Sequence, residues 1–278
     1  MEISNVCNLS CSFCPRSKRE KTVMTREQFC HAISEIKPFC DFVYFHVKGE
    51  PLMHPDLEYF LKVCEENSLK VNITTNGTLL SEKKDILLFS SALRQLNVSV
   101  HSFEDKKLQQ SYLENAVEFS KILAEKGVYA VLRLWNLSGE RNVDEITKES
   151  IDYINRTLCP DIDLFEKMKE KRSVCALKNL FISFEEKFEW PSLESDHCAD
   201  GYCHGARDQV AILSDGTVVP CCLDAEGVVN LGNVFKTPFS QIITSKRFTD
   251  IKNGFAARRA VEKLCKKCTF KSRFDIKI

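Results

Sequence analysis

Two hydrophobic periods alternate along the first two-thirds of the chain. Runs rich in β-branched and aromatic residues predict strands, and runs with apolar residues at three- and four-residue spacing predict helices. Strands are predicted at 41–47, 70–74, 95–100, 128–135 and 179–184, with a short first strand at 1–4. Helices are predicted at 55–67, 81–89, 112–126 and 143–158, with Ser81 as an N-cap and Gly127 as a C-terminal stop.

Repeated strand–helix units indicate a parallel sheet, because parallel neighbours need crossover connections. Six strands suit an α/β fold of the partial, TIM-like (β/α)6 type better than a closed eight-stranded barrel. After Pro191 the pattern changes, since 209–213 and 217–221 flank Ser-Asp-Gly as a hairpin would. We therefore predict a main domain over 1–190 and a small C-terminal domain over 191–278.

Polar and thiol residues follow the predicted strands at the ends where α/β proteins bind ligands. The carboxyl ends of parallel strands meet on one rim, so these residues predict a pocket there. They are Cys7, Cys11 and Cys14; Lys48, Gly49 and Glu50; Thr75, Asn76 and Gly77; Ser99, His101 and Ser102; and Arg133, Trp135 and Asn136.

Composition narrows the function classes. Lys+Arg and Asp+Glu number 39 each, and this balance argues against an extended nucleic-acid surface. No apolar run is long enough for a membrane span and no signal peptide is evident, so we expect a cytoplasmic protein. The 14 cysteines are then expected to be metal ligands, catalytic groups or buried packing residues rather than disulfides.

The N-terminal cysteines have the spacing C-x3-C-x2-C at Cys7, Cys11 and Cys14. Three thiolates so close together can hold three corners of a cubane iron–sulfur cluster and leave one iron open. A structural zinc site would normally need a fourth ligand nearby, and the nearest candidates lack zinc-finger spacing.

This triad resembles the signature of the radical S-adenosylmethionine (radical SAM) superfamily. Phe13 before the third cysteine strengthens the likeness, as do Gly49-Glu50-Pro51 after the second predicted strand and Thr74-Thr75-Asn76-Gly77 after the third. The resemblance extends over essentially the whole chain. It has two departures: Lys48 stands where the family more often has glycine, and the strand before Cys7 is short.

The resemblance implies roles for these residues. Cys7, Cys11 and Cys14 would bind a [4Fe–4S] cluster whose open iron takes the amino and carboxylate groups of S-adenosylmethionine (SAM). Electron transfer to the sulfonium would release a 5′-deoxyadenosyl radical that abstracts hydrogen from a substrate. The cofactor-binding residues would be Gly49 and Glu50 at the methionine amino group, Ser99 at the ribose, Arg133 at the methionine carboxylate and the Phe13 backbone at the adenine.

A second group of cysteines lies in the last third of the chain. It resembles the abbreviated auxiliary-cluster domain, called a twitch domain, of the SPASM group, and so implies one further [4Fe–4S] cluster. The implied ligands are Cys203, Cys221, Cys265 and Cys268, with Cys198 and Cys222 as alternates. The alternative for these residues is a structural zinc held by four cysteines.

Several residues could face a substrate: His46, His101, Trp135 and Asn136. The simpler interpretation makes the histidines partly buried packing residues, the tryptophan a core residue and the asparagine a turn residue. The catalytic acid and base are not assigned. Basic pairs such as Arg258-Arg259 and Lys266-Lys267 are either solvated faces or a docking patch for a flavodoxin- or ferredoxin-type electron donor.

Three functions remain open at this point. The first is a radical enzyme acting on a small molecule, for which the best specific hypothesis is a queuine lyase that releases 7-aminomethyl-7-deazaguanine. The second is maturation of a ribosomal peptide by thioether formation or epimerisation. The third is a zinc-binding interaction protein without catalytic activity.

Overall fold

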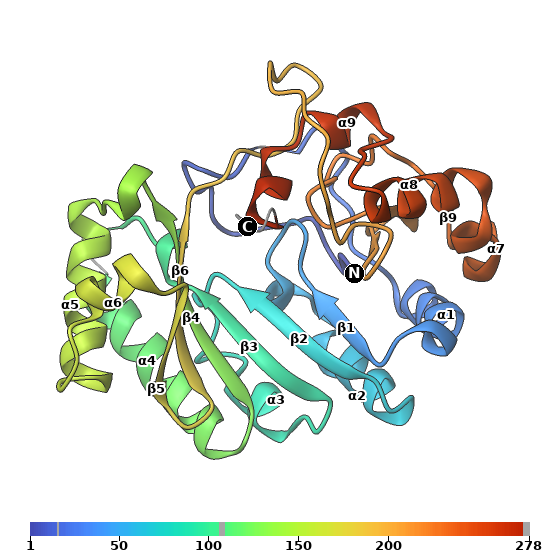
Figure 1. Ribbon diagram of the computed structural model, residues 1–278. Helices are drawn as coiled ribbons and strands as arrows, with labels where there is room; N and C mark the ends of the chain where they lie inside the picture. Colours follow the sequence, from blue (N-terminus) through green and yellow to red (C-terminus); the bar gives the residue numbers. More distant parts are fainter. Residues whose placement is uncertain (16, 106–108, 275–278) are drawn as a thin grey trace.

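A six-stranded, mostly parallel sheet is the centre of the computed structural model, which describes residues 1–15, 17–105 and 109–274. The strand order is β1-β2-β3-β4-β6-β5, and every neighbouring pair is parallel except β5 and β6. The strands are β1 (Phe42–Phe45), β2 (Lys70–Thr75), β3 (Leu93–Ser99), β4 (Tyr129–Leu137), β5 (Ser173–Leu177) and β6 (Leu180–Glu186). The carboxyl ends of the parallel strands therefore share one edge (Figure 1).

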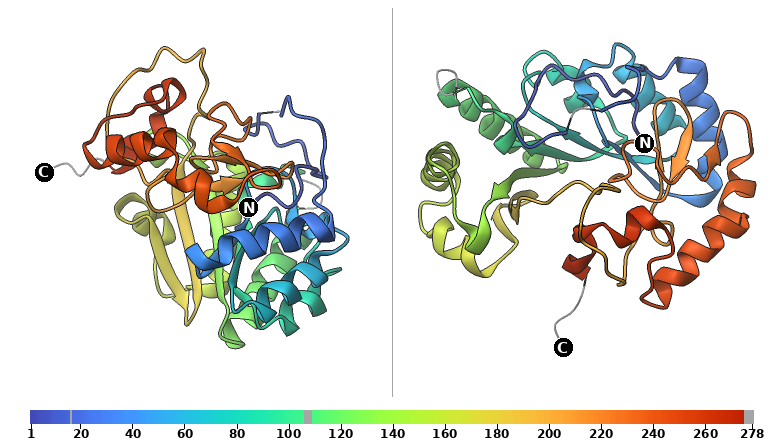
Figure 2. Two further views of the ribbon diagram at one scale, coloured as in Figure 1. Left: turned by 90° about the vertical axis from the view of Figure 1, so that its right-hand side faces the viewer. Right: turned by 90° about the horizontal axis from the view of Figure 1, so that it is seen from above.

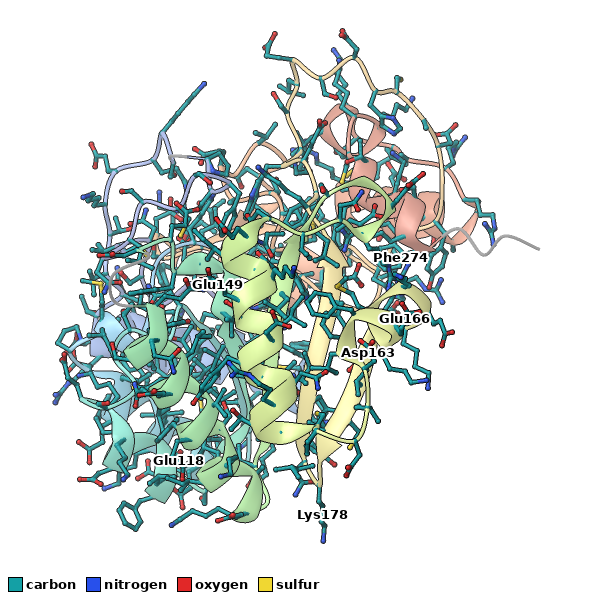
Figure 3. The ribbon with its side chains drawn as sticks, turned by 90° about the vertical axis from the view of Figure 1, so that its left-hand side faces the viewer. Glu118, Glu149, Asp163, Glu166, Lys178 and Phe274 are labelled. Atoms are coloured by element: carbon teal, nitrogen blue, oxygen red, sulfur yellow. The ribbon has the colours of Figure 1, made fainter. Side chains whose placement is uncertain are left out.

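Helices connect these strands and cover the outer face of the sheet (Figure 1). They are α1 (Arg26–Ile36), α2 (Leu57–Glu66), α3 (Lys84–Phe89), α4 (Gln109–Glu125), α5 (Glu145–Leu158) and α6 (Leu164–Glu170). Their apolar faces are buried, whereas the exposed Glu118, Glu149 and Glu166 lie on the outer surface (Figure 3). None of the described helices has both the length and the apolar character needed to cross a membrane.

Most of the predicted elements are present. The strands predicted from 41 onward correspond to β1, β2, β3, β4 and β6, and the helices predicted at 55–67, 112–126 and 143–158 correspond to α2, α4 and α5. Local chemistry sets some of the ends. The Asp144 side chain accepts a hydrogen bond from Thr147 N at 2.7 Å and so starts α5, and α4 stops just before Gly127, whose φ is +88°.

The first predicted strand is wrong. Residues 1–4 form no strand, and Ser4 makes only an isolated antiparallel bridge to Val23. This segment instead lies beside β1, where the Met1 amino group donates to Tyr44 O at 2.7 Å. The sixth strand of the sheet is β5, which the sequence did not predict, and it runs antiparallel at the edge.

The N-cap prediction at Ser81 is also wrong. Helix α3 begins after Lys83, which makes no side-chain capping bond. Ser81 Oγ donates instead to Asn115 Oδ1 at 2.9 Å, which joins the start of this segment to α4. The hydroxyl is therefore occupied in a tertiary contact rather than a capping bond.

The C-terminal part is built around a small antiparallel sheet of β7 (Ala211–Ile212), β8 (Thr217–Val219) and β9 (Gly232–Asn233). This confirms the hairpin predicted around Ser-Asp-Gly. Helices α7 (Phe239–Thr244), α8 (Lys246–Ala256) and α9 (Lys263–Lys266) follow, and α8 contributes to a second apolar cluster. The hairpin lies beside the N-terminal segment, because Glu2 N donates to Ile212 O at 2.8 Å (Figures 1 and 2).

No helix or strand occurs between the end of β6 at Glu186 and the start of β7 at Ala211. This stretch leads from the carboxyl end of β6 to the C-terminal part (Figure 2). The domain boundary predicted near Pro191 falls inside it and stays a prediction.

Candidate functional site

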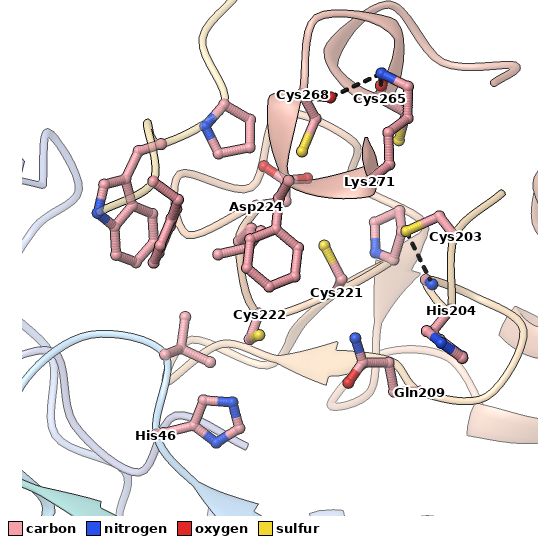
Figure 4. A pocket seen from close by; sticks show the side chains of 18 of the residues that line it. His46, Cys203, His204, Gln209, Cys221, Cys222, Asp224, Cys265, Cys268 and Lys271 are labelled. Carbon is pink, nitrogen blue, oxygen red and sulfur yellow. Dashed lines mark hydrogen bonds between the residues drawn. The ribbon is translucent and has the colours of Figure 1, made fainter. Parts of the chain in front are cut away.

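A cavity of about 540 Å³ lies between the carboxyl ends of the strands and the C-terminal part (Figure 4). This size suits a small-molecule ligand. Its lining includes, from the strands and loops, Phe13, Cys14, His46, Ser99, His101, Arg133 and Trp135; from the connecting stretch, Phe188 and Trp190; and from the C-terminal part, Cys203, Cys221, Cys222, Asp224, Cys265 and Cys268. The fold thus brings most of the sequence-predicted site residues to one place.

The N-terminal cysteines lie on an irregular loop before α1. Cys7 Sγ accepts hydrogen bonds from Leu9 N at 3.4 Å and Asn76 Nδ2 at 3.8 Å, and Cys11 Sγ donates to Ser102 O at 3.4 Å. Burial raises the pKa of the Cys11 thiol to about 11, with further contributions from the nearby Cys14 and Cys7 thiols. These thiols are therefore close enough to influence one another.

Gly49 brings the loop after β1 against the main chain that precedes Cys7. Its φ is +77°, and a Cβ atom there would lie 2.4 Å from Ser4 O and 2.8 Å from Val6 O. The next residue, Glu50, donates its N–H to Val6 O at 2.8 Å. Only glycine fits this close approach, so this position helps to place the first cysteine.

Glu50 is 1% exposed, and its carboxylate is used within the protein. It accepts hydrogen bonds from Leu52 N at 2.9 Å, Thr75 Oγ1 at 2.7 Å and Asn76 N at 2.6 Å. Burial raises the pKa of this carboxyl, and these hydrogen bonds oppose the rise. Glu50 therefore joins the loops after β1 and β2, whatever further contact it makes with a ligand.

Arg133 has no carboxylate partner among the described residues. Its Nη1 atom lies 3.4 Å from Thr74 Oγ1, its guanidinium carbon lies 4.3 Å from the centre of the Trp135 ring, and its Nε is buried without a partner. Burial lowers the pKa of Arg133 to about 10. A buried guanidinium facing a cavity is a site for an anionic group.

The two histidines differ in their surroundings. His46 lines the cavity, and its Nδ1 is buried without a partner. Burial, the N-terminal ammonium and Arg133 lower the pKa of His46 to about 3, so its ring is neutral at pH 7. His101 Nδ1 is paired with Arg133 O at 3.0 Å, and its ring packs on Phe13 with centroids 5.0 Å apart.

Trp135 and Asn136 were both predicted to face a substrate, but their side chains have different surroundings in the structure. The Trp135 ring lines the cavity, and its Nε1 donates to Ser183 Oγ at 3.0 Å. Asn136 is not part of the cavity lining, and its Nδ2 donates to Thr147 Oγ1 at 2.7 Å on α5. Successive residues of a strand point to opposite faces, which explains the separation.

The C-terminal cysteines converge on the cavity (Figure 4). Burial, aided by the neighbouring Cys203 and Cys268 thiols, raises the pKa of Cys265 to about 12. Burial likewise raises the pKa values of Cys203, Cys221 and Cys268. Of the two alternates, Cys222 lines the cavity, whereas Cys198 is exposed and does not.

Thiolates that surround a cubane lie further apart than those that bind one ion, and this bears on the zinc alternative. Ligands of a single tetrahedral zinc are about 4 Å from one another, given Zn–S bonds of about 2.3 Å. Across residues 1–15, 17–105 and 109–274, no three Cys, His, Asp or Glu side chains are grouped to hold a single metal ion. Cysteine is the usual protein ligand of iron–sulfur clusters, so either cysteine group could supply ligands to one.

Lys48, Trp190 and Lys271 were assigned no specific role from the sequence, although Lys48 was placed on the predicted rim. Lys48 Nζ lies 3.4 Å from Cys14 Sγ, and Trp190 lines the cavity beside it. Lys271 is 3% exposed and donates to Cys265 O at 3.1 Å and Cys268 O at 2.7 Å. In the sequence, Lys48 stands out because it departs from the family pattern. Nothing distinguishes Lys271 from the other lysines near the C-terminus.

Comparisons with known protein families agree with this geometry. The model of the radical SAM superfamily matches residues 1–150, just over half of the chain. The model of SPASM, an iron–sulfur cluster-binding domain, matches residues 203–269, which include the four C-terminal cysteines predicted as ligands. The second match supports an iron–sulfur cluster over the zinc alternative.

Curated relatives cover most of the chain at low identity. A probable GTP 3′,8-cyclase of Methanosarcina mazei is 26% identical over 272 residues, which cover 84% of this chain and 79% of the relative. The tungsten-containing aldehyde ferredoxin oxidoreductase cofactor-modifying protein of Pyrococcus furiosus is 23% identical, with 99% of this chain and 88% of the relative covered.

Solved structures of similar fold cover almost the whole chain. BtrN in complex with AdoMet and 2-DOIA matches with a TM-score of 0.55 and 16% identity, covering 96% of this chain and 90% of BtrN. The enzyme anSMEcpe with bound AdoMet and a peptide matches with a TM-score of 0.59 and 14% identity, covering 96% and 84%. These likenesses confirm the predicted α/β fold class with its C-terminal appendage.

Proposed function

Since this chain belongs to the radical SAM superfamily, we propose that it abstracts hydrogen from a small molecule held between its two cysteine groups. A protein with these two family matches is an iron–sulfur enzyme that uses SAM, one catalytic [4Fe–4S] cluster and one auxiliary [4Fe–4S] cluster. The observation that carries the proposal is the 540 Å³ cavity, because Cys14 lines it from one side and the C-terminal cysteines line it from the other. We assign 1–190 to the radical domain and 191–278 to the auxiliary domain.

Cys7, Cys11 and Cys14 are the proposed ligands of the catalytic cluster. When bound, this cluster supplies the electron that cleaves SAM and yields a 5′-deoxyadenosyl radical. The protein's part is to hold the loop in place, and two contacts support that role. Gly49 packs on the chain before Cys7, and Asn76 donates to the Cys7 thiol and to Asn8 Oδ1.

The proposed SAM-binding residues surround this loop. Arg133 is assigned to the methionine carboxylate, supported by its lack of a carboxylate partner among the described residues and by its unpartnered Nε. Ser99, at the end of β3, is assigned to the ribose, and the Phe13 backbone to the adenine. Gly49 and Glu50 remain assigned to the amino group, with Glu50 also fixing the two loops through its three hydrogen bonds.

Cys203, Cys221, Cys265 and Cys268 are the proposed auxiliary ligands. Their shared cavity and their electrostatic influence on one another support this set. Cys222 is left as a cavity-lining thiol, packed against the apolar cluster of Ala211, Leu213 and Val219. The exposed, basic Arg258 and Arg259 lie in the same part of the chain and are assigned to docking of a flavodoxin- or ferredoxin-type electron donor.

The proposed substrate is a planar heterocycle, with queuine as the first candidate. Aromatic side chains of Phe13, Trp135, Phe188 and Trp190 supply surfaces on which a flat ring can stack. The neutral His46, with its unpartnered Nδ1, supplies a hydrogen-bonding group. The reaction with queuine would break the bond between the exocyclic nitrogen and the cyclopentenediol. GTP is the second candidate, because the 26% identical relative is named a probable GTP 3′,8-cyclase.

The test is an anaerobic assay of the reconstituted, reduced protein with SAM and one candidate at a time. We expect 5′-deoxyadenosine to rise several-fold above the substrate-free level with one candidate, and 7-aminomethyl-7-deazaguanine to appear with queuine. The variant with Cys7, Cys11 and Cys14 all changed to Ala should form neither. A wild-type protein that holds iron at the triad yet never cleaves SAM would overturn the proposal, and the absence of any product from queuine would reject that substrate.

A further inference from the structure

Lys48 points inward from the loop after β1 and touches three groups. Lys48 is buried, with only 8% of its surface exposed. The Nζ atom lies 3.4 Å from Cys14 Sγ, donates to Pro15 O at 2.9 Å and lies 3.8 Å from the centre of the Trp190 ring. The ammonium is thus enclosed by a thiol, a carbonyl and an aromatic face.

No carboxylate among the described residues forms an ion pair with Lys48. Arg133 shares this property, whereas Arg19 is paired with Glu2 at 2.7 Å. A buried charge without a counter-charge is costly, and proteins rarely retain one unless a ligand or a metal centre supplies the opposite charge. The nearest group that becomes negative on binding metal is the Cys14 thiol.

The backbone around Lys48 is held in an uncommon conformation. Val47 has a φ of +118°, which is rare for a β-branched residue, and Gly49 follows with a φ of +77°. Such strain is costly and persists only where the surroundings fix it. Here Val47 packs against the apolar cluster of Ala211, Leu213 and Val219, and the bond from Glu50 N to Val6 O fixes the other side of the loop. The strained turn presents Lys48 to Cys14.

We propose that Lys48 raises the reduction potential of the catalytic cluster through its charge and its N–H···S contact with Cys14. This rests on the proposed function, in which Cys14 is a cluster ligand. Reduction adds one negative charge to a centre held by three thiolates, so a fixed positive charge beside one ligand stabilises the reduced state more than the oxidised state. One electron arrives from the donor protein, and no bond to Lys48 forms or breaks in this step.

Trp190 has a part in this arrangement. Its ring covers the ammonium from the side of the connecting stretch. Excluding water lowers the local dielectric, which strengthens the interaction between Lys48 and the charge on the cluster. Trp190, which lies shortly after the end of β6, thus strengthens the effect of Lys48 on the cluster at the N-terminal cysteines.

Redox titration of the reconstituted Lys48→Met holoenzyme, followed by electron paramagnetic resonance, tests the proposal. At a fixed potential we expect the ratio of reduced to oxidised catalytic cluster to fall about tenfold, which is a shift of about 59 mV for one electron. Lys48→Arg keeps the charge and should stay near the wild-type value. Lys21→Met removes an exposed lysine between the cysteine triad and α1, and it should leave the potential unchanged.

Two further measurements separate the possible failures. In a background with Cys7, Cys11 and Cys14 changed to Ala, Lys48→Met should leave the potential of the remaining auxiliary cluster unchanged. A triad that never binds iron contradicts the proposed function itself. A triad that binds iron with wild-type potential in Lys48→Met, at full iron content, overturns only the role of Lys48.

The contact between Lys48 and Trp190 can be checked in protein that holds no iron–sulfur cluster. The chain has 2 tryptophans, so Trp135→Phe leaves Trp190 as the sole emitter. In that cluster-free protein, Lys48→Met should shift the emission maximum, because it removes a cation from the ring face. An unchanged spectrum contradicts the enclosed geometry on which the proposal depends.

Discussion

Thr75 donates its hydroxyl proton to Glu50 at 2.7 Å and thereby joins the loops that follow the first two strands of the sheet. The same hydroxyl oxygen accepts a hydrogen bond from Gly77 N at 3.0 Å. The two loops are thus fixed to each other by one buried side-chain pair. The rim of the sheet is preorganised before any cofactor binds.

Thr75→Val should destabilise the protein by roughly 1–3 kcal/mol, because it removes one hydrogen bond from a buried carboxylate and leaves the buried Gly77 N–H without its partner. Urea denaturation followed by circular dichroism measures the free energy of unfolding. Thr244→Val is the matched control, since Thr244 is exposed and its hydroxyl bonds only within α7. Equal effects of the two substitutions would contradict the role given to this pair.

Three glycine-to-alanine substitutions separate steric clash from backbone strain. Gly49→Ala suffers both, since its φ is +77° and its new Cβ would lie 2.4 Å from Ser4 O. Gly127→Ala has the strained φ of +88° but nothing within 4 Å, and Gly139→Ala has neither problem. We expect a loss of about 1 kcal/mol for Gly127→Ala, a clearly larger loss for Gly49→Ala and almost none for Gly139→Ala. Iron bound at the N-terminal triad should fall only in Gly49→Ala.

Arg19→Met should cost roughly 3–5 kcal/mol, because it leaves the Glu2 carboxylate buried without its cation. The side chains of this pair are 13% and 0% exposed, and Glu2 also accepts from Ser214 Oγ at 2.8 Å. Lys121→Met removes a pair whose side chains are 34% and 63% exposed, and it should cost less than about 1 kcal/mol. Thermal unfolding of both variants beside wild type measures the difference, and a similar small loss in each would reject a structural role for the Glu2 pair.

Stability should fall when the pH is lowered from 7 to 5, in part because of His101. Burial lowers the pKa of His101 from 6.5 to about 4, so the unfolded chain binds a proton at pH 5 that the folded chain does not. The stabilisation from a neutral His101 is therefore present above pH 6.5 and is lost as the pH falls toward 4. We expect a contribution of roughly 1–2 kcal/mol between pH 7 and pH 5.

The control for that prediction is His101→Asn, which cannot titrate in this range. Its unfolding free energy should depend less on pH than that of wild type, by the amount assigned to His101. Anaerobic unfolding of the holoenzyme at both pH values gives the comparison. Identical pH dependence in the two proteins would exclude His101 as a source.

The proposed auxiliary ligands can be distinguished from their neighbours by metal analysis. Cys203→Ser should lower iron and sulfide from roughly eight to roughly four of each per chain, because one of two [4Fe–4S] clusters is lost. Cys198→Ser and Cys222→Ser should keep the full content, since one thiol is exposed outside the cavity and the other packs against the apolar cluster of Ala211, Leu213 and Val219. A loss of iron in Cys222→Ser with none in Cys203→Ser would require a different ligand set.

Features with a strong local signal could be predicted from the sequence. The cysteine spacings and the turn at Ser-Asp-Gly are such features, because a few adjacent residues carry the information. The helix α1 and the strand β5 were missed although both carry local signals. Thr25 and Gln28 form a capping box at the start of α1, and β5 pairs with β6 across a turn of two residues. Asn136 was placed with Trp135 because they are neighbours in sequence, but the alternation of the strand separates them.

The electrostatic character of the site could not be predicted at all. That Arg133 lacks a carboxylate partner among the described residues, and that Lys48 approaches Cys14, are properties of three-dimensional packing. A sequence gives the number of charges, which balance here at 39 each, but not which of them are left without a neighbour of opposite sign.

The cavity has walls from two parts of the chain, with strand residues on one side and residues from the C-terminal part on the other. In the proposed function, the radical is generated beside the first wall, whereas the second wall is built by the stretch of residues 203–274. Exchanging that stretch between relatives should therefore redirect the enzyme toward new molecules while leaving its capacity to cleave SAM intact. Enzymes that share the same radical-forming part could then acquire new substrates by recombination rather than by point substitution.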